Sequence, residues 1–279
     1  MTDVWLIRLL RLSALVAALM LGGIVTLLLG ETLPFFWQQG GSILSSRWYP
    51  GDGEFGMAAM IAGSLFVAVL ALLLAAPVAV ALAAWLRWFA PVWLRRPALA
   101  LFSLMAGIPS VVYGLWGLLV LVPWLNARVP PGTSWLAGSL VLALMILPLA
   151  LLVTDSALAQ IPRTWLNAGR ALALSRVGML RRVVLPRAAP GILAGVVLQF
   201  GRALGETMAV LMVCGNVVQW PDSVFEPVRT LTANIALEMA YASGEHRVAL
   251  FASGLLLMTV TMGLLALSWR FGRRRHDPA

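Results

Sequence analysis

Six long apolar runs constrain this chain more than any other feature of its sequence. Each run approaches or exceeds the roughly 20 apolar residues that a transmembrane helix needs. Only 11% of the residues are charged and 61% are hydrophobic, whereas a soluble domain carries about 25% charged residues. We therefore predict an all-α polytopic membrane protein, with a single transmembrane domain over residues 1–279. The six expected transmembrane helices are residues 12–30, 57–86, 98–125, 135–160, 190–216 and 247–269.

The arginines predict the orientation of these helices. All 20 basic residues are arginine, and positive charge gathers in the cytoplasmic segments beside membrane spans. If the N-terminus is inside, Arg202 lies within a span, only Arg47, Arg128, Arg229 and Arg247 lie outside, and the other fifteen arginines lie inside. Both termini are therefore expected in the cytoplasm. This topology accounts for the net charge of +9, so we do not expect nucleic-acid binding.

The first run could be a cleaved signal peptide or a permanent helix. It is longer than the apolar region of a signal peptide, which spans roughly 7–15 residues, and no A-x-A cleavage site follows it. An uncleaved first helix is therefore the expectation.

Several classes of site are not expected from the residue types present. The single cysteine, Cys214, excludes an internal disulfide, and His246 and His276 lack the spacing of a zinc site. We find no Ser/His/Asp set, and without lysine the chain cannot supply the G-x-x-x-x-G-K-[ST] loop that binds ATP. We therefore expect neither a metal site nor an enzyme, and any ATP-driven step needs a partner chain.

The fifth run contains two ionisable residues of opposite sign, Arg202 and Glu206. A charge at this depth costs about 2.5–3.5 kcal/mol even on lenient insertion scales. Residues four apart share one face of a helix, so the two head groups can meet, but such a pair returns only about 0.2–0.5 kcal/mol. We interpret the pair as a functional polar site; the alternative is a structural cross-link between helices. Gly201 and Gly205 flank it and favour close helix packing.

The third run contains the sequence AGIPSVVYGLWG at residues 106–117. Proline removes a backbone donor and kinks a helix, and the hydroxyls of Ser110 and Tyr113 follow it. This combination is typical of a partly unwound helix that lines a pathway. Pro77 and Pro148 lie inside two other runs, where neighbouring helices can satisfy the freed carbonyls.

A polar, arginine-rich segment at residues 161–187 lies on the cytoplasmic side in this topology, where it can bind anionic lipid or dock a cytosolic partner. The run NAGRALALS at 167–175, followed by V-V-L-P at 183–186 and P-G at 190–191, resembles the EAA loop of ABC importer permeases. That resemblance implies a short coupling helix that seats in an ATPase subunit. Asn167 replaces the motif's glutamate, Gly169 its second alanine and Ala173 its later glycine. The residues assigned to coupling by the resemblance are Asn167, Ala168, Gly169, Arg170, Ala171, Leu172, Ala173 and Ser175.

Four blocks narrow the resemblance: FGMAAMIAGSL at 55–65, AGIPSVVYGLWGLLVLVP at 106–123, GRALGETMAVLMVCGN at 201–216 and PVRTLTANIA at 227–236. Together they resemble the phosphate-specific permease of the PstC type. The resemblance implies a type I ABC importer permease of the bacterial inner membrane. It also implies three partners: a PstA-type permease, a PstB-type ATPase dimer that binds ATP-Mg, and a PstS-type periplasmic phosphate-binding protein.

The family's intramembrane arginine and glutamate fall on Arg202 and Glu206, and both are associated with phosphate passage. Phosphate carries a charge of about −1.5 to −2 near neutral pH, and the arginine fork matches its oxygens. Glu206 can neutralise the empty site and then be displaced or accept the phosphate proton. Ser110, Tyr113 and Thr207 complete the predicted pathway; Ser110 and Thr207 are the weaker candidates, and helix packing is the favoured interpretation of each. The alternatives are a permease for molybdate, sulfate or phosphonate, and a mainly phosphate-sensing membrane subunit.

Overall fold

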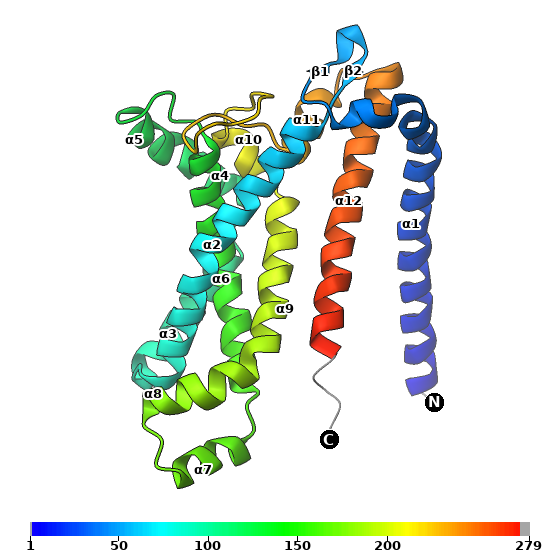
Figure 1. The fold of residues 1–279 in the computed structure, drawn as a ribbon. Helices are drawn as coiled ribbons and strands as arrows, with labels where there is room; N and C mark the ends of the chain where they lie inside the picture. The colour runs from blue at the N-terminus through cyan, green and yellow to red at the C-terminus, as the bar shows by residue number, and fades with distance from the viewer. Residues whose placement is uncertain (1, 274–279) are drawn as a thin grey trace.

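The computed structural model describes the backbone of residues 2–273 and the surroundings of the side chains of residues 5–266. Long helices lie side by side, with short helices and a two-stranded hairpin at one end and α7 and α8 at the other (Figure 1). Following the predicted orientation, we call the end with the hairpin the outer end and the end with α7 the inner end. The side chains of Arg270, Arg273, Arg274, Arg275 and His276, which were used in the sequence predictions, lie outside the described residues.

The prediction of six membrane spans is confirmed, with one of them broken. Five helices are long and apolar enough to cross a membrane, and a sixth span is bent by 92° between α3 and α4. The long helices are α1 (Thr2–Gln39), α2 (Ala58–Trp88), α6 (Trp135–Ala159), α9 (Leu185–Leu204) and α12 (Gly244–Arg273). The bent span consists of α3 (Val92–Ala106), α4 (Ser110–Trp116), the π-helical turn η3 (Gly117–Leu121) and α5 (Val122–Asn126).

The remaining elements are short and lie at the two ends of the bundle. At the inner end are α7 (Arg163–Ala171), α8 (Arg176–Met179) and the π-helical turn η4 (Leu180–Val184), which continues into α9. Elsewhere the elements are η1 (Gly40–Leu44), β1 (Trp48–Tyr49), η2 (Pro50–Asp52), β2 (Glu54–Phe55), α10 (Met208–Val213) and α11 (Leu231–Glu238). The strands β1 and β2 pair antiparallel, with Trp48 opposite Phe55.

The core of the bundle lies where α2 packs along α6. Alanines recur on one face of α2 at intervals of three or four residues and are almost completely buried, so the two helices approach closely: Ala68, Ala71, Ala75, Ala79 and Ala83. Larger side chains of α6, among them Leu142, Ile146 and Leu151, are fully buried against this region. Helix α6 begins at a serine cap, where the Ser134 hydroxyl accepts the Ala137 amide at 3.2 Å.

The fifth span differs from its predicted range of 190–216. It forms one apolar helical stretch over Arg176–Leu204 and ends well before residue 216. The helix can begin this early although it contains Pro186, which has no amide hydrogen to donate. The π-helical turn η4 ends two residues before Pro186 and shifts the hydrogen-bond register there, so the helix continues past the proline. Part of the predicted 161–187 loop is therefore the first section of this helix.

Candidate functional site

The two intramembrane charges lie on opposite sides of a helix break. Arg202 is in the last turn of α9, whereas Glu206 lies in the short segment that separates α9 from α10. The prediction that they share one face of one helix is therefore wrong, and within the described part of the chain no ion pair joins them. Two local features favour the break. Gly205 is a poor helix former, and a Glu206 carboxylate oxygen accepts the Ala209 amide at 3.3 Å, in the first turn of α10.

Arg202 is exposed in the isolated chain. Among the described residues it has no hydrogen-bond or ion-pair partner. An unpaired guanidinium in a membrane span is costly, so its charge needs a ligand or a residue from another chain. The geometry therefore leaves Arg202 available for an anion, because the neighbouring Glu206 carboxylate accepts the Ala209 amide instead.

The break is anchored to the outer part of the bundle. The Thr232 hydroxyl, in α11, donates to the Glu206 carbonyl at 2.8 Å and also lies 3.1 Å from the Thr230 hydroxyl. The Thr207 hydroxyl donates to the Gly205 carbonyl at 3.4 Å, within the break itself. These contacts fix the backbone at Glu206 and leave one of its two carboxylate oxygens without a hydrogen bond to the described residues.

The bent third span brings two further predicted residues to this region. Tyr113 donates its hydroxyl hydrogen to the Met105 carbonyl at 2.9 Å, across the bend between α3 and α4. Ser110 is the first residue of α4 and is half-buried. Helix α4 packs directly on α10, because a Cβ at Gly114 would lie only 2.9 Å from the Ala209 Cα atom.

The predicted pathway residues thus come from two segments that break helical regularity. Ser110 and Tyr113 follow the bend in the third span, and Thr207 and Glu206 follow the break in the fifth. Among the described residues no hydrogen bond joins Tyr113 to Arg202, and the Tyr113 hydroxyl donates to the Met105 carbonyl at the bend. The substrate role of all five residues remains a prediction.

The coupling segment, residues 161–187, contains the predicted short helix as α7. Its exposed side carries Asn167, Ala168, Arg170 and Ala171, and Leu172 follows it with 76% of its surface exposed. The guanidinium of Arg187 lies 3.6 Å above the Trp165 ring and ties α7 to α9. Helix α7 lies below the rest of the bundle at its inner end (Figure 1), and these side chains are exposed to solvent in the isolated chain.

The structure explains one departure from the EAA pattern, Gly169, and shows that another, Ala173, is conformationally strained. Gly169 faces Met179 of α8, and a Cβ at position 169 would lie 2.6 Å from the Met179 sulfur. The methionine therefore occupies the space of the alanine that the motif places there. Ala173 has a φ of 51°, in the left-handed region that favours glycine, so the motif's glycine corresponds to a real backbone requirement. Ser175 then accepts the Gly178 amide at 3.1 Å and caps α8.

The sequence analysis missed an ion cluster at the inner end. Asp155 of α6 receives the Arg87 Nε and Nη2 hydrogens at 2.8 and 3.0 Å, and Arg95 of α3 approaches both carboxylate oxygens at 3.4 Å. The cluster ties together the inner ends of α2, α3 and α6. The available signal was an aspartate in an otherwise apolar span, but its partners lie 68 and 60 residues away along the chain.

A second missed cluster surrounds Glu238, the last residue of α11. The Glu238 side chain is buried and accepts hydrogen bonds from Arg229 at 2.7 Å and from the Trp48 indole at 2.8 Å. His246 contacts the same carboxylate at 2.8 Å. This carboxylate joins the hairpin, α11 and α12, so its role is structural.

A third missed residue lies within the fifth span itself. Gln199 precedes Arg202 by one helical turn and is fully buried. Within the described part of the chain, neither its amide nitrogen nor its amide oxygen has a hydrogen-bond partner. A buried amide of this kind carries a desolvation cost.

Comparison with known proteins gives one family and several relatives. The family described as "Binding-protein-dependent transport system inner membrane component" matches residues 75–278. The "Phosphate transport system permease protein PstC" of Mesorhizobium japonicum is 34% identical, over 92% of this chain and 86% of its own length. The protein of the same name from Haemophilus influenzae is 33% identical, over 92% and 89%.

Solved structures share the fold at lower identity. An inward-facing MetNI methionine ABC transporter matches with a TM-score of 0.60 and 19% identity, covering 78% of this chain and 94% of that one. A bacterial ABC transporter involved in alginate import also matches with a TM-score of 0.60, at 17% identity over 98% and 99%. At these identities the likeness concerns the fold alone.

Proposed function

Because the chain belongs to the family of binding-protein-dependent transport system inner membrane components, we propose that it is the permease subunit of an ATP-driven importer of inorganic phosphate. It forms half of the translocation pathway, and a homologous PstA-type permease forms the other half. A PstB-type ATPase dimer on the inner side binds ATP-Mg, and a PstS-type periplasmic protein delivers phosphate on the outer side. The chain itself holds no cofactor and catalyses no reaction.

The similarity to relatives named as phosphate transport permeases supports phosphate as the substrate. This similarity extends over about nine-tenths of the chain in several of them, so it covers most of the membrane domain. The chemistry of Arg202 agrees with this choice. A guanidinium stays protonated at any physiological pH and offers paired donors to phosphate oxygens.

The helix break at residues 205–207 gives the transfer step its physical basis. In a continuous helix Glu206 would sit one turn from Arg202 and neutralise it. Here Glu206 instead caps α10, so the Arg202 charge is open to an incoming anion. Once the anion is bound, the nearby carboxylate repels it, or accepts a proton from it, and prevents Arg202 from becoming a storage site.

The outward face of α7 is the proposed contact with the ATPase. Small side chains at Ala168 and Ala171 allow a partner surface to approach closely, and Leu172 adds an exposed apolar contact. Met179 and Arg187 hold α7 against the bundle, so a movement of the ATPase is transmitted to α8 and α9, and then to Arg202 at the far end of α9.

Uptake of radiolabelled phosphate tests the proposal. The chain is expressed with its partner permease, ATPase and binding protein in a strain that lacks its own high-affinity phosphate importer. We expect uptake that requires this chain and that unlabelled phosphate suppresses, whereas excess sulfate or molybdate leaves it unchanged. Suppression by molybdate or sulfate would instead identify another oxyanion as the substrate. Phosphate-dependent signalling without uptake would identify a sensing subunit.

Deletion of residues 167–175 tests the coupling assignment separately. The deletion variant is expected in the membrane together with the partner permease but without bound ATPase after purification. An ATPase that still co-purifies in full yield would show that the docking surface lies elsewhere on the chain.

A further inference from the structure

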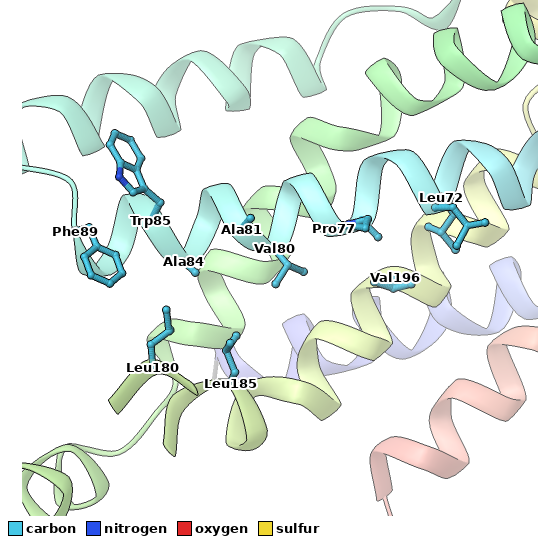
Figure 2. A pocket seen from close by; sticks show the side chains of 12 residues that line it. Leu72, Pro77, Val80, Ala81, Ala84, Trp85, Phe89, Leu180, Leu185 and Val196 are labelled. Carbon is cyan, nitrogen blue, oxygen red and sulfur yellow. The ribbon is translucent and has the colours of Figure 1, made fainter. Parts of the chain in front are cut away.

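An apolar groove opens on the inner half of the bundle, between α2 on one side and η4 with α9 on the other. Its volume is about 670 Å³, within the range of roughly 300–1,000 Å³ found for small-molecule pockets. Figure 2 shows Leu72, Val80 and Trp85 of α2 on one wall and Leu180, Leu185 and Val196 on the other. All the residues that line the groove are aliphatic or aromatic, so it is suited to a hydrocarbon chain.

Small residues on one face of α2 create this groove. Ala76, Pro77, Ala81 and Ala84 line it where larger side chains would fill the space. The alanines that pack toward α6 occupy other positions of the helix, so the contact with α6 does not close the groove. Within it, Leu73 remains 65% exposed. The isolated chain thus leaves a long apolar surface inside the membrane uncovered.

Aromatic side chains line the inner mouth of the groove, and two arginines directly follow one of its lining residues in the sequence. Trp85 and Phe89, near the inner end of α2, are both part of the lining, and tryptophan is enriched at the depth of lipid headgroups. Leu180, on the opposite wall, is followed directly by Arg181 and Arg182. Both arginines are exposed, and among the described residues neither has an ion-pair partner.

We propose that this groove binds an anionic phospholipid of the inner leaflet. One acyl chain lies between α2 and α9, and the headgroup phosphate binds Arg181 and Arg182. Basic sites on the cytoplasmic side of membrane helices bind anionic headgroups in this way. An apolar helix of a partner chain could also cover the groove, but it offers no anionic group to Arg181 and Arg182. A phospholipid supplies both the hydrocarbon chain and the phosphate, and for that reason it is the better occupant.

The bound lipid contacts the segment where η4 continues into α9. Its binding site includes Leu180 and Leu185, which belong to η4 and to the first turn of α9. The bound chain therefore fills the space between the start of the fifth span and α2.

Photolabelling of the assembled complex in lipid nanodiscs tests the proposal. The probe is phosphatidylglycerol with a diazirine in one acyl chain, present as a minor component in phosphatidylcholine. We expect the label to concentrate in peptides from residues 72–89 and 180–196, and the same diazirine on phosphatidylcholine to label them less. Each of the changes Arg181→Gln and Arg182→Gln is expected to lower the phosphatidylglycerol label about fivefold, from about 1 kcal/mol per arginine near an anionic surface.

Two variants of α2 provide the matched comparison. Val80→Phe places a ring in the groove and is expected to remove the label, whereas Val78→Phe, at an exposed position of the same helix outside the groove, leaves it unchanged. Equal labelling of the groove and of α1, or equal labelling by both lipids, would overturn the proposal. A Val80→Cys variant that cross-links in high yield to the partner permease would overturn it as well, because the groove would then be filled by protein.

Discussion

Met179 occupies the space that a side chain at Gly169 would need: a Cβ there would lie 2.5 Å from the methionine Cε and 2.6 Å from its sulfur. The two residues join α7 to α8 at the inner end of the molecule. Arg187, stacked 3.6 Å above Trp165, provides a second link between α7 and the long helix. The proposed ATPase-coupling helix is therefore tied to α8 and α9 by two side-chain contacts.

A double-mutant cycle of Gly169 and Met179 should show that their effects on the free energy of unfolding are not additive. Met179→Ala should lower the free energy of unfolding by about 2–5 kcal/mol, the usual range for a buried methionine. Gly169→Ala alone should change it little, because the end of the methionine can move aside and alanine favours the helix by about 1 kcal/mol. In the double variant the new methyl fills part of the cavity, so the loss should be smaller than the sum. Thermal unfolding followed by tryptophan fluorescence measures it, and strictly additive effects would contradict the contact.

Glycine at position 173 should stabilise the coupling segment. Ala173 has a φ of 51°, and a left-handed conformation costs an ordinary residue about 1–2 kcal/mol. Ala173→Gly is therefore expected to raise the unfolding free energy by about 1 kcal/mol. The matched control is Ala168→Gly within α7, which should lower it by about 0.5–1 kcal/mol. Proteolytic protection of residues 161–187 reports both changes, and a destabilising Ala173→Gly would show that the strain is absent.

The apolar runs and arginine positions were enough to predict the six spans, because each run of this length must form a helix in lipid. The bend in the third span was also predictable, since Pro109 comes two residues after Gly107 and removes a backbone donor. The break after Leu204 was not. It depends on the Glu206 carboxylate capping α10 and on Thr232 binding the Glu206 carbonyl, and the second of these partners lies 26 residues further along the chain.

The candidate site was predictable in its residue types but not in its geometry. Arg202 and Glu206 could be identified because they are charged residues within an apolar run. Their spacing of four predicted an ion pair on one helix face, but the helix ends at Leu204, between them. Asp155 was overlooked because a single acid near the end of a span has no local motif, and only the fold brings Arg87 and Arg95 to it. In the coupling segment, the resemblance to the EAA loop was enough to predict a short helix at α7. The close approach of Met179 to Gly169 could be seen only in the three-dimensional structure.

Asp155 should be important for stability. Its side chain is 12% exposed and is shared by Arg87 and Arg95. Asp155→Asn leaves two guanidinium groups without their counter-ion and is expected to cost about 3–5 kcal/mol, the range for breaking a buried ion pair. The control is Arg47→Gln, which removes a pair with side chains 75% and 43% exposed and should cost less than about 1 kcal/mol. Similar melting temperatures for the two variants of the purified complex would refute the structural role of the cluster.

Replacing Gln199 is expected to raise stability, in contrast to the loss expected for Asp155→Asn. Because neither amide atom is hydrogen-bonded among the described residues, Gln199→Leu removes an unmet desolvation cost at similar volume. The variant is expected to be more stable by about 1–3 kcal/mol, measured by thermal unfolding of the assembled complex. Gln199→Glu, which buries a charge at the same position, should be strongly destabilising. A loss of stability in the leucine variant would mean that the amide has a partner in the working complex.

The most direct measurement is the initial rate of radiolabelled phosphate uptake by complexes that carry Arg202→Gln, with ATPase co-purification as the check on assembly. Loss of a charge-assisted hydrogen bond of about 1.5–3 kcal/mol predicts a fall in the rate of about tenfold or more, and Arg202→Lys should retain part of it because the charge remains. Arg128→Gln, at an outer arginine that stacks on Trp124, should transport normally. Unchanged uptake by a fully assembled Arg202→Gln complex would contradict the proposal that this guanidinium passes phosphate across the membrane.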